Sequence, residues 1–207
     1  MAARTEANRK KIRFMALITI FAAIEVIFCF TPLGSLPLGG GIVATLSHLP
    51  VIIAAVLLGT KAGAVLGGVF GVCSLVWWST IGVASPSAFA FTPLGAHGNF
   101  FSLLICIVPR ILLGVIAALL YRLLDDKIGN IPAAVVSAVL STVCHSVMVL
   151  GSIYLCFSGN AELSALIGGN FVAMVVAWAG INAVMEIIAA GLVSGALIKP
   201  LLKVYKK

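Results

Sequence analysis

Apolar residues follow one another in six long runs, and the short segments between them carry most of the charged residues. The runs cover roughly residues 14–31, 42–60, 62–83, 100–124, 131–157 and 170–198. Each run has about 18 to 29 residues, which is enough for a tilted helix to cross a bilayer. The pattern predicts an all-α fold, in which residues 1–207 form a single domain of six transmembrane helices.

The composition and the placement of charge agree with this class. Hydrophobic residues make up 62% of the chain, charged residues 9%, and the mean hydropathy is +1.22, far from the balance of soluble domains. The net charge of +7 does not indicate a nucleic-acid partner, because the basic residues lie at the chain ends and in short connections. With both termini cytoplasmic, six helices put every one of the 13 Lys and Arg residues except Arg110 on the cytoplasmic side, as the positive-inside rule requires.

Motifs for enzymatic chemistry or nucleotide binding are absent from the sequence. It contains no GxxxxGK[ST] phosphate-binding loop, no HExxH and no GxSxG. The five cysteines lack CxxC spacing, which indicates packed thiols rather than a zinc site or a disulfide framework. We therefore expect no cofactor and no enzymatic activity.

Arg110 stands inside the fourth apolar run, directly after Pro109. An arginine at the centre of a membrane helix costs about 2.5 to 3.5 kcal/mol on insertion scales, so it needs a partner. Glu25 and Glu186 lie at comparable depth in other runs. The sequence leaves open whether one of them pairs with Arg110 or whether Arg110 holds an anionic substrate.

Other polar residues in the apolar runs are candidates for the same site. Trp178, Asn182 and Glu186 follow one another at steps of four, which puts them on one helix face that we expect to look into the bundle. His145 lies on a face with several serines, which predicts either helix–helix hydrogen bonds or a seam that contacts a ligand. His48 precedes Pro50 and is either a structural residue or a ligand contact.

The outer connections and two helix faces made of small residues give further predictions. The five residues Phe30–Gly34 recur as Phe91–Gly95, and the long segment that contains the second copy and ends at Asn99 suggests a lid over a cavity. Gly63, Gly67 and Gly71 predict a close-packing face. A second small-residue face on the first helix predicts either internal packing or a docking surface: Ala16, Thr19 and Ala23.

Over nearly its whole length the chain resembles the substrate-binding S components of energy-coupling factor (ECF) vitamin transporters. The segments that are similar to the pantothenate-type subgroup are Thr31–Gly34, Leu36–Gly39, Thr45–Ile53, Val108–Gly114 and Asn182–Glu186. Two positions depart from the pattern. Thr19 stands where the helix-one motif commonly has alanine, and His145-Ser146 stand where similar sequences often carry Asn-Thr, which would change the ligand if that position touches it.

The resemblance implies a high-affinity binding subunit, embedded in the bacterial plasma membrane, that captures a vitamin from outside, with pantothenate as the first expectation. The subunit would dock on a transmembrane coupling subunit with two cytosolic ATPases and topple to deliver its substrate. Docking is expected on the helix-one face. The expected substrate-binding residues are Arg110, Asn182, Glu186, His145, His48, Asn99 and Trp178.

Three alternatives remain at this point. The chain would also suit an S component for riboflavin, a queuosine precursor or another compound. A self-contained secondary transporter would use Glu25 or Glu186 as a proton site. A membrane-embedded enzyme is the third, although no nucleophile or metal ligand accompanies the two glutamates.

Overall fold

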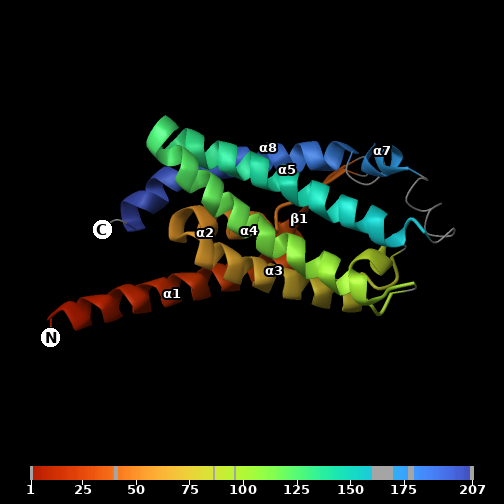
Figure 1. Ribbon diagram of the computed structural model, residues 1–207, viewed down its shortest axis with the longest axis horizontal. Coiled ribbons are helices and arrows are strands. Elements are labelled where there is room, and N and C mark those ends of the chain that lie inside the picture. Colours follow the sequence, from red (N-terminus) through yellow and green to blue (C-terminus); the bar gives the residue numbers. More distant parts are fainter. Residues whose placement is uncertain are drawn as a thin grey trace.

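A computed structural model describes residues 2–39, 42–85, 87–95, 97–159, 170–176 and 180–205. Long helices run side by side along one axis, and both ends of the chain lie at the same end of the bundle (Figure 1). Each long helix contains a stretch apolar enough to cross a membrane, which confirms the predicted all-α bundle. These helices are α1 (Ala2–Phe30), α3 (Thr60–Thr80), α4 (Phe100–Ile128), α5 (Asn130–Phe157) and α8 (Gly180–Tyr205).

The second apolar run is divided, so the helix expected over residues 42–60 is wrong in its first part. Strand β2 (Ile42–Thr45) pairs antiparallel with β1 (Ser35–Gly39), and α2 (Leu49–Leu58) is only ten residues long. An apolar run alone does not distinguish a short strand from a helix, and β-branched residues such as those that open β2 favour strands. A proline in the first turn, Pro50, suits the later helix start.

The sixth run is also divided, so the continuous helix expected over residues 170–198 is wrong. Helix α7 (Phe171–Met174) leads into a π-turn at residues 175–176, and α8 starts afresh at Gly180 and runs past 198 to Tyr205. Gly180 has a φ of +39°, a backbone conformation outside the helical region that glycine adopts more readily than other residues. Asn182 and Glu186 keep their predicted four-residue spacing on α8.

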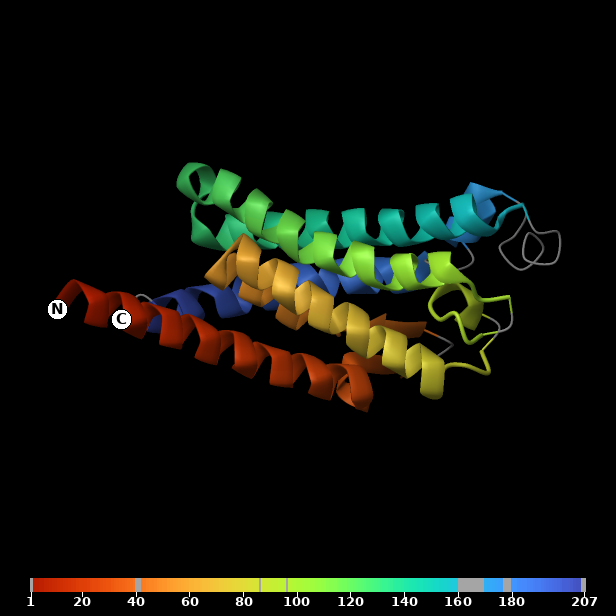
Figure 2. The same ribbon diagram turned by 60° about the horizontal axis from the view of Figure 1, so that its bottom comes forward.

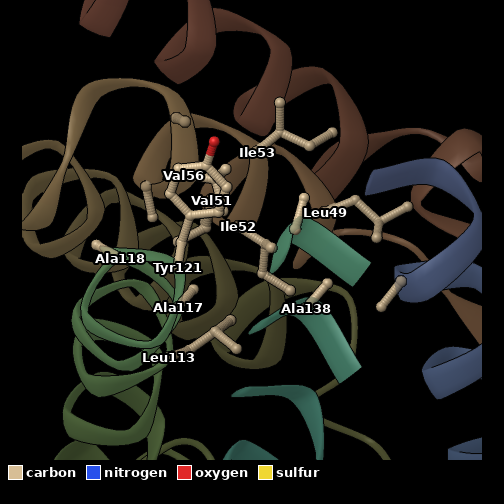
Figure 3. Close-up of a cluster of buried hydrophobic side chains, with 14 of the residues drawn as sticks. Leu49, Val51, Ile52, Ile53, Val56, Leu113, Ala117, Ala118, Tyr121 and Ala138 are labelled. Atoms are coloured by element: carbon tan, nitrogen blue, oxygen red, sulfur yellow. The ribbon is translucent and has the colours of Figure 1, made fainter. Parts of the chain in front are cut away.

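Helix α2 forms the centre of the bundle. It contacts α1, α3, α4 and α8, while α3 packs on α4, α4 on α5, and α5 on α8. Helix α1 lies along the outside in both views (Figures 1 and 2). Figure 3 shows the apolar core around α2, made by Leu49, Val51, Ile52, Ile53 and Val56 of α2, Leu113, Ala117, Ala118 and Tyr121 of α4, and Ala138 of α5.

Two single glycines make the tight turns at the end of the bundle that holds both termini. Gly59 joins α2 to α3 with a φ of 90°, and Gly129 joins α4 to α5 with a φ of 83°. Lys61 and Lys127 flank these turns, whereas residues 81–85, 87–95 and 97–99 lie at the opposite end (Figure 1). The basic residues therefore gather at one end, as the charge pattern predicts.

Candidate functional site

The site is built around Arg110, which lies three turns into α4 and is 6% exposed. Pro109 has no backbone N–H, so the carbonyl of Ile105, four residues earlier, lacks its helical donor. The guanidinium takes that place, because Nη1 of Arg110 donates to the Ile105 carbonyl oxygen at 2.8 Å. Pro109 thus leaves one backbone carbonyl without its helical donor, and that carbonyl holds the guanidinium of Arg110 by a hydrogen bond.

Two aromatic rings face the guanidinium. The Cζ atom of Arg110 lies 5.7 Å from the ring centre of Phe70 on α3 and 5.2 Å from that of Phe91. Both distances are in the range of cation–π attraction. Trp78 stacks on Phe91 with ring centres 4.9 Å apart, and this contact helps to hold the Phe91 ring in place.

The loop that carries Phe91 is held firmly against the bundle. It follows the short 3-10 helix η2 (Ala88–Ala90), and the fully buried Thr92 has its hydroxyl 2.7 Å from that of Ser79 on α3. In the first copy of the repeated five-residue motif the corresponding residue, Thr31, is exposed. The two copies therefore differ in structure, and only the second contributes a ring to the site.

Neither glutamate pairs with Arg110. Within the described ranges no carboxylate lies within 4.0 Å of its guanidinium. The ion pair that these ranges do contain joins Lys10 to Glu6 at 2.9 Å, in another part of the chain. Glu25 is fully buried and accepts a hydrogen bond from the Cys29 thiol at 3.3 Å. Glu186 is half-buried on α8, where its carboxyl lies near Thr45. Arg110 is therefore a buried cation without an acidic partner in the described part of the chain, and its Nε atom has no hydrogen-bond partner there.

Two histidines lie near this cation, as expected for candidate site residues. The His145 ring on α5 has its centre 6.5 Å from that of Phe70, and it lies within electrostatic reach of both Arg110 and His48. His48 is 4% exposed and stands directly before α2. In both rings Nε2 is buried and has no hydrogen-bond partner among the described residues.

The remaining expected site residues divide by position. Asn182 and Glu186 are half-buried on successive turns of α8. Asn99 is exposed and caps α4, because its side chain accepts a hydrogen bond from the Phe101 amide at 2.8 Å. Trp178 lies outside the described residues. A role in substrate binding remains a prediction for each of them.

The sequence analysis missed three residues of this region: Phe70, Phe91 and Thr45. Phe70 lies between Gly67 and Gly71 of the close-packing face, so the sequence did indicate that it lies close to a neighbouring helix. Phe91 belongs to the repeated motif, but nothing in the motif shows that its ring faces Arg110. The contact of Thr45 depends on the hairpin, which the apolar run concealed.

The face of α1 expected to dock a partner is uncovered in this chain. Ala16, Thr19 and Ala23 are all exposed, and the Thr19 hydroxyl is satisfied locally by the Met15 carbonyl at 3.0 Å. The opposite face packs on the bundle through partly buried residues that include Phe21. Internal packing within the described chain therefore does not account for the small residues.

Comparison with known proteins agrees with these features. Residues 13–198 match the family described as "ECF transporter, substrate-specific component". The pantothenic acid transporter PanT of Lactococcus lactis subsp. cremoris is 34% identical over 204 residues, which cover 95% of this chain and 97% of that protein. The pantothenate transporter PanT of Leuconostoc mesenteroides subsp. mesenteroides is 34% identical over 121 residues, which cover 56% of this chain and 53% of that protein. The chain is a multi-pass membrane protein that belongs to the substrate-specific (S) components of ECF transporters, and it is a transport subunit rather than an enzyme.

Proposed function

We propose that this S component binds pantothenate, and that Arg110 holds the carboxylate of the vitamin. The observation that carries the proposal is the buried guanidinium with no acidic partner in the described chain. A desolvated charge is tolerated when it is paired and hydrogen-bonded. The names of the two relatives, which describe pantothenate transport, support the same substrate.

The chemistry of the region suits such a molecule. A guanidinium presents a planar fork that matches a carboxylate with two parallel hydrogen bonds. Pantothenate also carries an amide and two hydroxyl groups, for which His145, His48 and Asn182 offer polar partners. Since Phe70 and Phe91 turn their faces to the guanidinium, they favour a charged group between them over a flat ring such as that of riboflavin.

We place the substrate-binding side outside the cell and both termini in the cytoplasm. The basic residues gather at the end of the bundle that holds the termini (Figure 1). Arg110 lies about 15 Å from the other end, given ten residues of α4 at about 1.5 Å each. The described residues of the loop that carries Phe91 would then cover the site as a lid, and residues 1–207 would act as one binding domain.

Energy for transport would come from partner subunits. The sequence has no nucleotide-binding motif, so a transmembrane coupling subunit with two cytosolic ATPases is the expected partner, as in the family. Its docking surface would be the exposed face of Ala16, Thr19 and Ala23, where small side chains allow a second helix to come close. Toppling of the loaded S component would then deliver the vitamin inside.

Isothermal titration of detergent-purified protein tests the substrate. Pantothenate is expected to bind with a dissociation constant well below that of riboflavin, measured under the same conditions. Native mass spectrometry of the protein as purified provides a second readout, because a tightly bound vitamin travels with it. Tight binding of riboflavin without binding of pantothenate would overturn the proposal.

A further inference from the structure

Helix α1 packs on the bundle through its second half. The residues of this half that contact the core are partly buried: Ile18, Phe21, Ala22 and Cys29. In the first half, every residue from Arg9 to Arg13 is exposed. Packing therefore holds the second half of α1 more firmly than the first, which lies at the end of the bundle where both chain ends are found (Figure 2).

Arg13 joins the exposed half of α1 to the end of α8. Its Nη2 atom donates a hydrogen bond to the carbonyl oxygen of Val204 at 2.9 Å, and its Cζ atom lies 5.2 Å from the ring centre of Tyr205. Val204 and Tyr205 are the last two residues of α8. The last four carbonyls of a helix have no partner within it, and the helix dipole makes a cation favourable beside them. Arg13 thus caps α8 from another helix, and we call this contact of Arg13 with Val204 and Tyr205 the clasp.

The clasp differs from the other side-chain hydrogen bonds described for α1, because those stay within the helix. The Thr19 hydroxyl donates to the Met15 carbonyl at 3.0 Å, and the Cys29 thiol donates to the carboxyl of Glu25 at 3.3 Å. Among the residues that the structure describes, Arg13 therefore provides the side-chain hydrogen bond that links α1 to another helix.

The small-residue face of α1 lies between the clasp and the packed half. Ala16 comes three residues after Arg13, and Ala23 comes two residues before the fully buried Glu25. A helix held at two points keeps both its tilt and its rotation. Both determine whether small side chains come close enough to a partner helix to pack against it. The direction of the face therefore depends on the clasp as well as on the packing.

Building on the proposed docking through α1, we propose that Arg13 is a positioning residue for assembly. By capping α8, it holds the first half of α1 at the tilt and rotation that present Ala16, Thr19 and Ala23 to the coupling subunit. The guanidinium is engaged with α8, so Arg13 acts through the direction of α1 and not through a contact with the partner.

Titration of the purified coupling module, the coupling subunit with its two ATPases, into the labelled S component measures docking as a dissociation constant. Two variants break the clasp, because Arg13→Gln removes the charge and Tyr205→Leu removes the aromatic face. Each has a matched control. Arg9→Gln removes another exposed charge one turn earlier on α1, and Tyr205→Phe keeps the ring. Pantothenate calorimetry and thermal unfolding accompany each titration.

We expect Arg13→Gln to weaken docking by about three- to thirtyfold, the range of a charge at a helix end together with a cation–π contact. Tyr205→Leu should weaken it less, and the double variant should be no weaker than Arg13→Gln, because both changes break the same contact. Both controls should dock like the wild type, and all variants should bind pantothenate with the wild-type affinity. A merely structural role would lower the melting temperature and leave docking of the folded protein unchanged.

A covalent link in place of the clasp gives an independent readout. Arg13→Cys combined with Tyr205→Cys is joined by a short bifunctional thiol reagent. Arg13→Cys alone, treated in the same way, controls for the five native cysteines. The joined protein should dock like the wild type, whereas the unjoined double variant should dock weakly.

Unchanged docking by Arg13→Gln, an equal loss in Arg9→Gln, or a joined variant that still docks weakly would overturn the positioning role of Arg13. The proposed docking face stands in each of these cases if Ala23→Trp fails to dock. If Ala23→Trp docks like the wild type, the docking face itself is wrong, and the role of the clasp falls with it.

Discussion

Gly63 of α3 and Gly114 of α4 meet backbone to backbone, and a Cβ atom added to either would overlap the carbonyl oxygen of the other. One turn further along α3, a Cβ at Gly67 would overlap the carbonyl oxygen of Arg110. The predicted close-packing face thus sets the distance between the two helices at the point where the buried cation lies. Arg110 and Phe70 are close because these glycines have no side chains.

Replacing one of these glycines should destabilise the bundle. Gly63→Ala and Gly114→Ala force α3 and α4 apart, and overpacking of this kind costs about 1–3 kcal/mol. Gly68→Ala is the matched control on α3, because a Cβ there meets no atom within 4 Å. It should be neutral or gain about 0.5–1 kcal/mol in helix propensity. Thermal unfolding in detergent measures all three, and equal melting temperatures would contradict the packing.

Pro109→Ala should separate ligand binding from stability. The restored backbone N–H would bond to the Ile105 carbonyl and compete with Nη1 of Arg110. We expect an unchanged or raised melting temperature. Pantothenate affinity should fall by about two- to twelvefold, since one neutral hydrogen bond is worth about 0.5–1.5 kcal/mol.

Pro200→Ala is the control for that change, because Pro200 also lies inside a helix but is exposed near the end of α8. It repairs a helix without reaching the site, so pantothenate affinity should stay at the wild-type value. Equal affinities for both proline variants would mean that the Ile105 carbonyl does not position the guanidinium.

Some of this architecture could be predicted from the sequence and some could not, for physical reasons. Long apolar runs and the charge asymmetry determine a membrane bundle and its basic end, because they depend only on local composition. The hairpin before α2 could not be predicted, since a strand and a buried helix have the same apolar signature over a few residues. The break before α8 likewise depends on the backbone conformation of Gly180.

The site shows the same division. Because a charge inside a membrane costs free energy, the sequence predicted that Arg110 is buried and that it either pairs with a glutamate or holds an anionic substrate. The sequence could not show that neither glutamate lies within 4.0 Å of Arg110, because pairing between helices depends on how distant segments meet. For the same reason Asn99 could be named as a polar residue of the outer segment, while its capping role in α4 required the helix start to be known.

The orientation of the protein in the membrane can be tested with introduced cysteines. Leu94→Cys lies in the loop of residues 81–99 at a position that is 70% exposed, and Lys127→Cys lies beside the turn at Gly129. An impermeant thiol reagent applied to intact cells should label the first and reach the second only after permeabilisation. The unaltered protein, with its five cysteines, gives the background. Labelling of both positions in intact cells would contradict the orientation.

Docking through α1 predicts a loss of assembly without a loss of binding. Ala23→Trp places a bulky ring on the exposed small-residue face and should abolish co-purification with the coupling subunit and vitamin uptake. Ligand affinity of the isolated protein should be unchanged, because Ala23 points away from the bundle.

Leu192→Trp provides the control, since Leu192 is 70% exposed and lies on α8 instead of α1. It adds the same ring to another exposed position and should leave assembly intact. If both variants lose the coupling subunit, or if Ala23→Trp weakens ligand binding as well, the small-residue face is not a dedicated docking surface.

The carboxylate clamp at Arg110 is tested most directly by calorimetric titration of pantothenate into purified Arg110→Lys, with thermal unfolding alongside. Lysine keeps the positive charge but loses the planar fork. A bidentate contact should weaken by about 1.5 to 3 kcal/mol, which is about tenfold to more than a hundredfold in dissociation constant, in a protein of normal melting temperature. An unchanged dissociation constant together with a lowered melting temperature would show that Arg110 supports the fold and does not hold the substrate.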